Sequence, residues 1–194
     1  MEILTFQIAT HEGMLEITDL VRDYVNRNQI KDGLIMLQAP EKSVGITFAD
    51  AADPNIEREY LKKLNHMLPK YDGMQFTGWS TPGIKAAFIG QSMQVMIQGG
   101  TLILGYQQGI FVADFAGPSD KRSLFISHIG TTLAEGEQAK IPAVLAQMNA
   151  QVEAEKEAAR LEQERVIAEM REEYAKRQAN LNAAEDEIES DRRL

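Results

Sequence analysis

The sequence predicts an α+β domain, largely antiparallel and β-sandwich-like, with two to three helices and a long C-terminal α-helix after it. Over the first 136 residues, apolar side chains recur with a period of two in some segments and with a helical period in others. Every Gly and Phe and the only Trp lie in this part, whereas residues 137–194 are rich in Ala, Glu, Gln and Arg. The first part can therefore bury a core, and the second cannot do so alone. We predict a domain over 1–136 and a charged, coiled-coil-like helix over 137–194.

The first predicted elements are a strand, a helix and two more strands. Apolar residues at every second position from Leu4 to Ile8 predict the first strand. Apolar residues between 17 and 25 then recur at helical spacing, and Thr18 or Asp19 would cap this helix. Two further strands are predicted over 34–37 and 44–48.

Two Xaa-Pro pairs predict the starts of two more helices. Asp53-Pro54 would begin the first, because the Asp side chain accepts an otherwise unpaired backbone N–H and the fixed φ of proline suits the first turn. Thr81-Pro82 would begin a shorter helix that ends at Gly90. Gly99-Gly100 predicts a tight hairpin turn. The remaining strands are predicted over 93–98, 102–104, 110–116 and 123–129.

From about Lys140 the pattern is helical almost to the end of the chain. A heptad of mostly apolar residues runs from Ile167 to Ile188, with Arg177 as its one polar member. Two interpretations stay open. The segment is either a solvated single helix held by its own i,i+4 ion pairs, or a helix that pairs with another helix or lies along a partner protein. The residues predicted to make such contacts are Ile167, Met170, Tyr174, Leu181 and Ile188.

Charge and composition exclude several classes of protein. The net charge is −9, and neither part has the excess of basic residues that nucleic-acid binding requires. The chain has no cysteine, which excludes disulfides and thiolate metal sites. The N-terminal residues lack the pattern of a signal peptide, and no segment has the ~20 apolar residues needed to span a bilayer. We therefore expect a cytoplasmic protein that binds no nucleic acid and does not span a membrane.

No constellation of residues demands catalysis by itself. His11, His66 and His128 have no metal-ligand spacing, and the sequence has no glycine-rich phosphate loop or nucleophile motif. Asp50 and Asp53 flank a strand-to-helix junction where they could attract a cation, although Asp53 is already explained as a helix cap. These patterns predict no catalytic residue, no metal and no cofactor.

A series of short motifs nevertheless occurs in a specific order between Ile3 and Gly130. In order and spacing these motifs resemble the YjbQ-like family, small proteins known as secondary thiamine-phosphate synthases. The resemblance covers the whole domain and none of the tail. It implies the family's fold and a homotrimer whose active cleft lies near the subunit contacts. The motifs include Ile30-Lys31-Asp32-Gly33-Leu34, Ala52-Asp53-Pro54, Gly83-Ile84-Lys85, Gln108-Gly109-Ile110-Phe111 and Phe115-Ala116-Gly117-Pro118.

The sequence departs from the family at all three of the family's histidine positions. The resemblance aligns these positions with Glu41, with Gly83 and with a position after Tyr71 that holds no histidine. Because neutral imidazole is the usual metal ligand and proton shuttle, the resemblance implies a scaffold that has lost its chemistry. By equivalence to the family, the candidate cleft comprises Glu41, Lys42, Asp50, Glu59, Gly83, Lys85, Gln108 and Asp114.

Three functions remain open at this point. In the first, the chain is a non-catalytic oligomeric scaffold formed by the domain, and the tail helices bundle together or dock on a partner protein. In the second, it is an enzyme whose site is rebuilt from the Asp and Glu residues of the candidate cleft. In the third, it is a binding module in which Lys42 and Lys85 hold a phosphorylated, pyrimidine-like ligand.

Overall fold

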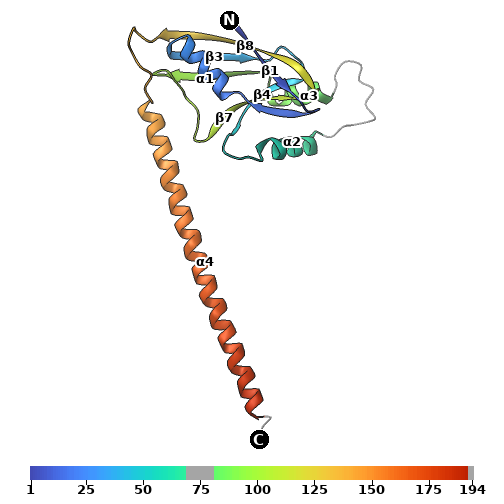
Figure 1. Cartoon of the computed structure of the whole chain (residues 1–194), viewed down its shortest axis with the longest axis vertical. Helices are drawn as coiled ribbons and strands as arrows, with labels where there is room; N and C mark the ends of the chain where they lie inside the picture. Colours follow the sequence, from blue (N-terminus) through green and yellow to red (C-terminus); the bar gives the residue numbers. More distant parts are fainter. Residues whose placement is uncertain (69–80, 192–194) are drawn as a thin grey trace. The chain divides into compact units, whose positions relative to one another are not determined.

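The computed structural model describes residues 1–68 and 81–191, and within the last helix it describes side chains as far as residue 171 and at Tyr174. The chain divides into two compact units, Met1–Ala146 and Gln147–Leu194. The first unit contains two β-sheets (Figure 1). The family-histidine position after Tyr71 lies outside the described residues. The division predicted at residue 136 stays a prediction.

Both sheets are antiparallel. The larger has the strand order β1-β8-β3-β5-β6, and the smaller has the order β2-β7-β4. The five-stranded sheet is built from β1 (Glu2–Ile8), β3 (Ile30–Gln38), β5 (Ser92–Gln98), β6 (Thr101–Leu102) and β8 (Ser119–Thr132). The three-stranded sheet is built from β2 (Gly13–Glu16), β4 (Val44–Asp50) and β7 (Gln108–Asp114).

The main hydrophobic core contains residues from both sheets. Ile35 of β3 and Val112 of β7 are both fully buried in it. Helix α1 (Thr18–Arg27) contributes Val21 and Tyr24 to the same core. The apolar residues that recur every second position in the strands and those at helical spacing in α1 therefore pack in the same core.

A second hydrophobic cluster covers the other face of the three-stranded sheet. Helices α2 (Ile56–Met67) and α3 (Thr81–Ile89) supply Leu64 and Ala86, which are buried in the same cluster as Phe111 of β7. In Figure 1, α2 lies on the side of β7 that faces away from β3 and β8. Strand β7 is thus buried on both faces, which explains the continuous apolar run over its residues 110–113.

The predicted fold class is confirmed, since the chain is α+β with antiparallel sheets and a long C-terminal helix. The predicted turn at Gly99-Gly100 is also confirmed. The φ angles of 59° and 81° there lie in the region that glycine adopts without strain. Strand β2 is an element that the sequence pattern did not predict, because its four residues do not alternate between apolar and polar.

The predicted helix starts need two corrections. No side chain caps α1, and Thr18 Oγ1 instead accepts a hydrogen bond from the N–H of Ile110 at 2.9 Å. Asp53 Oδ1 does accept a backbone N–H, that of Asn55 at 2.8 Å. That hydrogen bond stabilises a turn, and α2 begins only at Ile56.

The segment that connects β8 to the last helix is held against the preceding domain. Lys31 Nζ forms an ion pair with Glu137 at 2.6 Å. The carbonyl oxygen of Gly99 accepts the N–H of Lys140 at 2.7 Å. Further along, Leu145 is only 5% exposed. The connecting segment therefore packs with the domain.

Helix α4 (Ala143–Asp191) is 49 residues long, which corresponds to about 70 Å at 1.5 Å per residue. Its described part carries ion pairs one turn apart, including Arg160 with Glu157 at 2.7 Å and Arg165 with Glu162 at 2.6 Å. Among the residues that the structure describes, no helix combines the length and the apolar character needed to cross a membrane.

Candidate functional site

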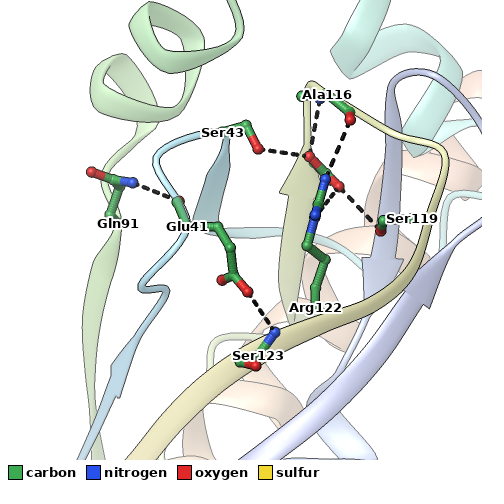
Figure 2. A network of polar contacts seen from close by, with 8 residues as sticks. Glu41, Ser43, Gln91, Ala116, Ser119, Arg122 and Ser123 are labelled. Atoms are coloured by element: carbon green, nitrogen blue, oxygen red, sulfur yellow. Dashed lines mark hydrogen bonds and ion pairs between the residues drawn. The ribbon is translucent and has the colours of Figure 1, made fainter.

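A buried carboxylate network lies at the end of β7 (Figure 2). Asp114, the last residue of that strand, is fully buried, and its Oδ2 forms an ion pair with Arg122 Nε at 2.6 Å. Its Oδ1 accepts hydrogen bonds from Ser43 Oγ at 3.1 Å and from the Ala116 N–H at 3.0 Å. Ser119 Oγ donates to Oδ2 at 3.4 Å. The carboxylate thus links the end of β7 to the residue before β4, to β8 and to the loop between β7 and β8.

Glu41 lies beside this network (Figure 2). Its Oε1 accepts the N–H of Ser123 at 3.0 Å, and its backbone carbonyl accepts a hydrogen bond from Gln91 Nε2 at 2.9 Å. Its Oε2 is buried and has no hydrogen-bond partner among the described residues. Because Ser123 directly follows the partner of Asp114 along β8, the structure brings the predicted residues Glu41 and Asp114 to the same region.

A buried lysine joins α2 and α3 to the loop between β1 and β2. Lys85 is fully buried, and its Nζ donates to Glu12 Oε1 at 2.5 Å and to Asn65 Oδ1. Asn65 Nδ2 donates in turn to Glu12 Oε2 at 2.8 Å, which closes a cluster of three polar side chains. The Lys85 ammonium also lies 5.7 Å from the centre of the Phe115 ring, within the range of a cation–π contact.

This cluster lowers the pKa of Glu12. Partial burial acts to raise that pKa, because it disfavours the charged form. Hydrogen bonds from Lys85 and Asn65 outweigh burial, together with the positive charge of Lys85 and that of His11. The pKa of Glu12 therefore lies below its ordinary value, and its carboxylate is charged at neutral pH.

Two other predicted residues lie far from Asp114. In the antiparallel pair of β4 and β7, Val44 is opposite Asp114 and Asp50 is opposite Gln108. Asp50 and Asp114 are therefore about 20 Å apart, at roughly 3.4 Å per residue along the strand. At that far end, Gln108 Oε1 accepts the N–H of Gly105 at 2.9 Å. The structure does not gather the predicted acidic residues into one site.

The last three predicted positions are dissimilar in environment. Lys42 is exposed, and Gly83 is buried within α3. Glu59 is half-exposed in α2, with its Oε1 3.7 Å from Arg58. Lys42, Gly83 and Glu59 therefore do not share one environment that could form a site.

The described residues offer no ready metal site. Among them, no group of three His, Cys, Asp or Glu side chains comes close enough to hold an ion. His128 Nδ1 lies 2.9 Å from the hydroxyl of Tyr24, a residue of the main core. His11 and His66 are exposed. The three histidines therefore do not replace those that the family resemblance leads one to expect.

Several residues of these polar clusters were not predicted from the sequence. Glu12 and Asn65 hold Lys85, and Arg122 holds Asp114. Arg122 follows the Gly-Pro motif at the β7–β8 connection, so its position was recognisable although its role was not. Glu12 and Asn65 are 53 residues apart in the chain, so no local sequence pattern predicts that they are in contact.

The predicted interaction residues of α4 are exposed wherever their side chains are described. Ile167, Met170 and Tyr174 have exposed fractions of 49%, 65% and 64%. Leu181 and Ile188 lie on the same helix, and their side chains are outside the described part of the chain. The first three thus form an apolar stripe on an otherwise charged helix.

The sequence profile of the family described as UPF0047 protein YjbQ-like matches residues 2–131. The chain belongs to this family. The match covers both β-sheets and ends before α4, so the helix lies outside what defines a YjbQ-like protein.

Relatives of the YjbQ-like domain occur in archaea and bacteria. The UPF0047 protein MJ1081 of Methanocaldococcus jannaschii is 31% identical over 131 residues, which span 66% of this chain and 94% of that protein. The UPF0047 protein YugU of Bacillus subtilis is 29% identical over 65% of this chain and 98% of its own length. A crystal structure of a YjbQ/UPF0047 protein from Clostridium acetobutylicum superimposes with a TM-score of 0.62 at 32% identity, covering 66% of this chain and all of that one.

Proposed function

We propose that this protein is a non-catalytic, homo-oligomeric scaffold of the cytoplasm. In this proposal the YjbQ-like domain forms a trimer, and the C-terminal helix pairs with other helices or docks on a partner protein. The observation that carries the proposal is the state of the charged groups in the candidate cleft. Asp114 and Lys85 are buried and bonded to other groups of the chain. Charges held in this way stabilise a fold and are not free to act on a substrate.

The bonding of Asp114 leaves little capacity for chemistry. A carboxylate has about four lone-pair sites. Four donors from the chain already approach the two oxygens of Asp114, and one of them is the charged Arg122. A metal ion or a transferred proton would have to displace one of these donors. This favours a structural role for Asp114.

The separation of the acidic residues argues against a rebuilt acidic enzyme site. Carboxylates that share one metal ion lie within a few ångströms of it, since metal–oxygen distances are about 2–2.6 Å. Asp50 and Asp114 instead lie at opposite ends of the β4–β7 pair. An enzyme that uses both would need a rearrangement of the sheet.

The lysines argue against a site for a phosphorylated ligand. Lys85 is buried and already paired with Glu12, and Lys42 is exposed on the surface. The buried Oε2 of Glu41, which has no hydrogen-bond partner among the described residues, favours a different ligand chemistry, that of a hydrogen-bond donor. Titration with phosphorylated pyrimidines at millimolar concentration is therefore expected to give no saturable binding. Saturable binding would establish the ligand-binding alternative.

Sedimentation of the full chain tests the scaffold proposal. We expect a trimer at micromolar concentration and no stoichiometric metal in the purified protein. A monomer at all concentrations would refute the scaffold. A stoichiometric divalent metal ion bound by carboxylate ligands would instead support the enzyme alternative.

A further inference from the structure

Helices α2 and α3 hold a carboxylate group between them. Lys85 Nζ of α3 donates to Glu12 Oε1 at 2.5 Å, and Asn65 Nδ2 of α2 donates to Glu12 Oε2 at 2.8 Å. Each oxygen of the carboxylate thus has its own donor, and one of the two donors is charged. Asn65 Oδ1 also accepts a hydrogen bond from Lys85, so the donors hold each other in place. We call this pair of donors the Lys85–Asn65 site.

The cation of this site is built into the interior of the domain. Lys85 is fully buried, and its ammonium lies 5.7 Å from the centre of the Phe115 ring. Leu64 and Ala86, the sequence neighbours of Asn65 and Lys85, are buried with Phe115 in the second hydrophobic cluster. Because burying an unpaired charge is very costly, a cation in this position requires an anion beside it. The site therefore calls for a carboxylate, whatever molecule supplies it.

The carboxylate that fills the site comes from a separate, exposed loop. Glu12 lies in the connection between β1 and β2, where residues 9–11 are exposed. The side chain of Glu12 is 15% exposed and that of Lys85 is 1% exposed, while Asn65 is an exposed residue. The Lys85–Asn65 site therefore opens at the protein surface, and its carboxylate lies at the opening.

The backbone next to Glu12 is held independently of this site. The carbonyl oxygen of His11 accepts the N–H of Gly117 at 2.8 Å, and Gly13 pairs with Asp114 in the β2–β7 ladder. The Glu12 side chain can consequently leave the site by rotation about its own bonds, while the loop keeps its place. Its departure would expose a carboxylate-binding site without unfolding the domain.

We infer that the Lys85–Asn65 site binds a small carboxylate ligand, and that Glu12 occupies it as an internal ligand which the external carboxylate displaces. This inference concerns one domain of one chain, so it does not depend on the proposed scaffold function. In this arrangement Glu12 acts as an autoinhibitory side chain, because the ligand must compete with a carboxylate that is tethered beside the site.

The donors favour a carboxylate over a phosphate. Lys85 supplies one positive charge and Asn65 supplies a neutral amide, which together match a single carboxylate. A phosphate monoester carries nearly two negative charges and three acceptor oxygens, so it matches this pair less well. The site also favours the charged form of its occupant, because burial acts to raise the pKa of Glu12 and that pKa is nevertheless lowered.

The test uses acetate as the probe and the full chain. Glu12→Ala removes a CH2 group and a carboxylate, which together correspond to acetate, and it is expected to lower the Tm because Lys85 loses its anion. Sodium acetate is expected to restore the Tm saturably, by roughly 3–6 °C at a tenfold excess over Kd. Acetamide, which is uncharged and similar in shape, and sodium chloride at equal ionic strength should not do so. If Glu12→Ala does not fold, Glu12→Ser replaces it.

Two further variants show whether acetate binds at the proposed place. Glu57 is the matched control, since its carboxylate lies beside the same loop but accepts the N–H of Met14 at 3.1 Å. Glu57→Ala should respond to acetate only as the unchanged protein does. Adding Asn65→Leu to Glu12→Ala should weaken acetate binding at least tenfold. The inference is refuted if folded Glu12→Ala responds no more than Glu57→Ala, or if its response survives Asn65→Leu.

The unchanged protein tests the displacement of Glu12. It is expected to bind acetate at least tenfold more weakly than Glu12→Ala, because the tethered carboxylate competes. The NMR signal of the Glu12 carboxyl carbon should shift saturably with acetate and stay in place with acetamide. An unmoved signal, or equal acetate affinities of the two proteins, would show that Glu12 is not an internal ligand. The oligomeric state decides the scaffold proposal separately and has no bearing on these outcomes.

Discussion

The two β-sheets of this protein differ in how they are covered. The three-stranded sheet is buried on both faces, by the main core on one side and by α2 and α3 on the other. The five-stranded sheet buries one face and leaves the other open. Strand β7 is accordingly apolar over residues 109–113, between Gln108 and Asp114, whereas β3 and β5 alternate between buried and exposed positions.

We propose that the three-stranded sheet mainly contributes stability and that the five-stranded sheet carries the function. The covered sheet holds the buried ion pairs Asp114–Arg122 and Lys85–Glu12, which fasten strands and helices to one another. The five-stranded sheet has an outer face, which points away from the core, and Ile129, Leu34 and Met96 form an apolar row across it. In our proposal, the charged residues of the candidate cleft stabilise the fold, and the outer face is available for assembly.

The largest expected effect concerns the buried pair at the end of the covered sheet. Asp114→Ala would leave Arg122 and two serine hydroxyls without their acceptor, and breaking a buried pair costs about 3–5 kcal/mol. The free energy of unfolding from urea titrations measures this loss. Asp120→Asn, at an exposed position, is the control and is expected to change stability little. Equal stability of both variants would contradict a structural role for Asp114.

Adjacent residues of β3 compare the two faces of the open sheet directly. Ile35 is fully buried, and Ile35→Ala should cost about 2–5 kcal/mol of monomer stability. Leu34 points to the outer face, and Leu34→Ala should cost about 1 kcal/mol or less. Both are measured in the full chain at a protein concentration at which sedimentation gives a monomer. Similar losses at both positions would show that the outer face is not free in the monomer.

Acid should act on the layer that covers the three-stranded sheet. Because the pKa of Glu12 is lower in the folded protein than in the unfolded chain, the unfolded chain binds the proton more readily. The contribution of Glu12 is therefore fully present above its unfolded pKa and is lost as the pH falls through its folded pKa. We expect Glu12→Gln to flatten the decline in stability between neutral pH and this range. Glu155→Gln on α4 is the control, and an unchanged decline in Glu12→Gln would contradict the assignment.

The smallest effect is expected at the connecting segment. Hydrogen bonding to Glu137 and its negative charge raise the pKa of Lys31, so the contribution of this pair is lost as the pH rises through that pKa. Both side chains are partly exposed, at 37% and 29%, so solvent screens the pair. Lys31→Gln is therefore expected to leave the Tm at neutral pH unchanged within error. A large drop in Tm would mean that the connection governs the stability of the domain.

Local patterns predicted much of the fold and less of the site. The period of β1 and the glycines of the hairpin at Gly99-Gly100 are local signals, and the structure confirms both. Strand β2 was missed because four residues without alternation carry no such signal. The contact of Lys85 with Glu12 joins residues 73 positions apart, so only the packed fold reveals it.

Some residues of the candidate cleft lie together in the structure, and others do not. Glu41 and Asp114 lie in one region because β4 and β7 are antiparallel and Val44 pairs with Asp114. The same pairing sends Asp50 to the opposite end. Equivalence to the family could align these residues along the chain, but strand direction determined which of them meet.

Chemical labelling of the outer face tests the central claim most directly. The chain has no cysteine, so Gln94→Cys introduces a single reactive thiol on that face, and Lys63→Cys does so on the exposed side of α2. We predict that a maleimide labels Gln94→Cys slowly in the assembled protein and rapidly after dilution to monomers, while Lys63→Cys reacts rapidly in both states. Equally rapid labelling of Gln94→Cys in the assembled protein would contradict the account, because the outer face would then be open in the oligomer.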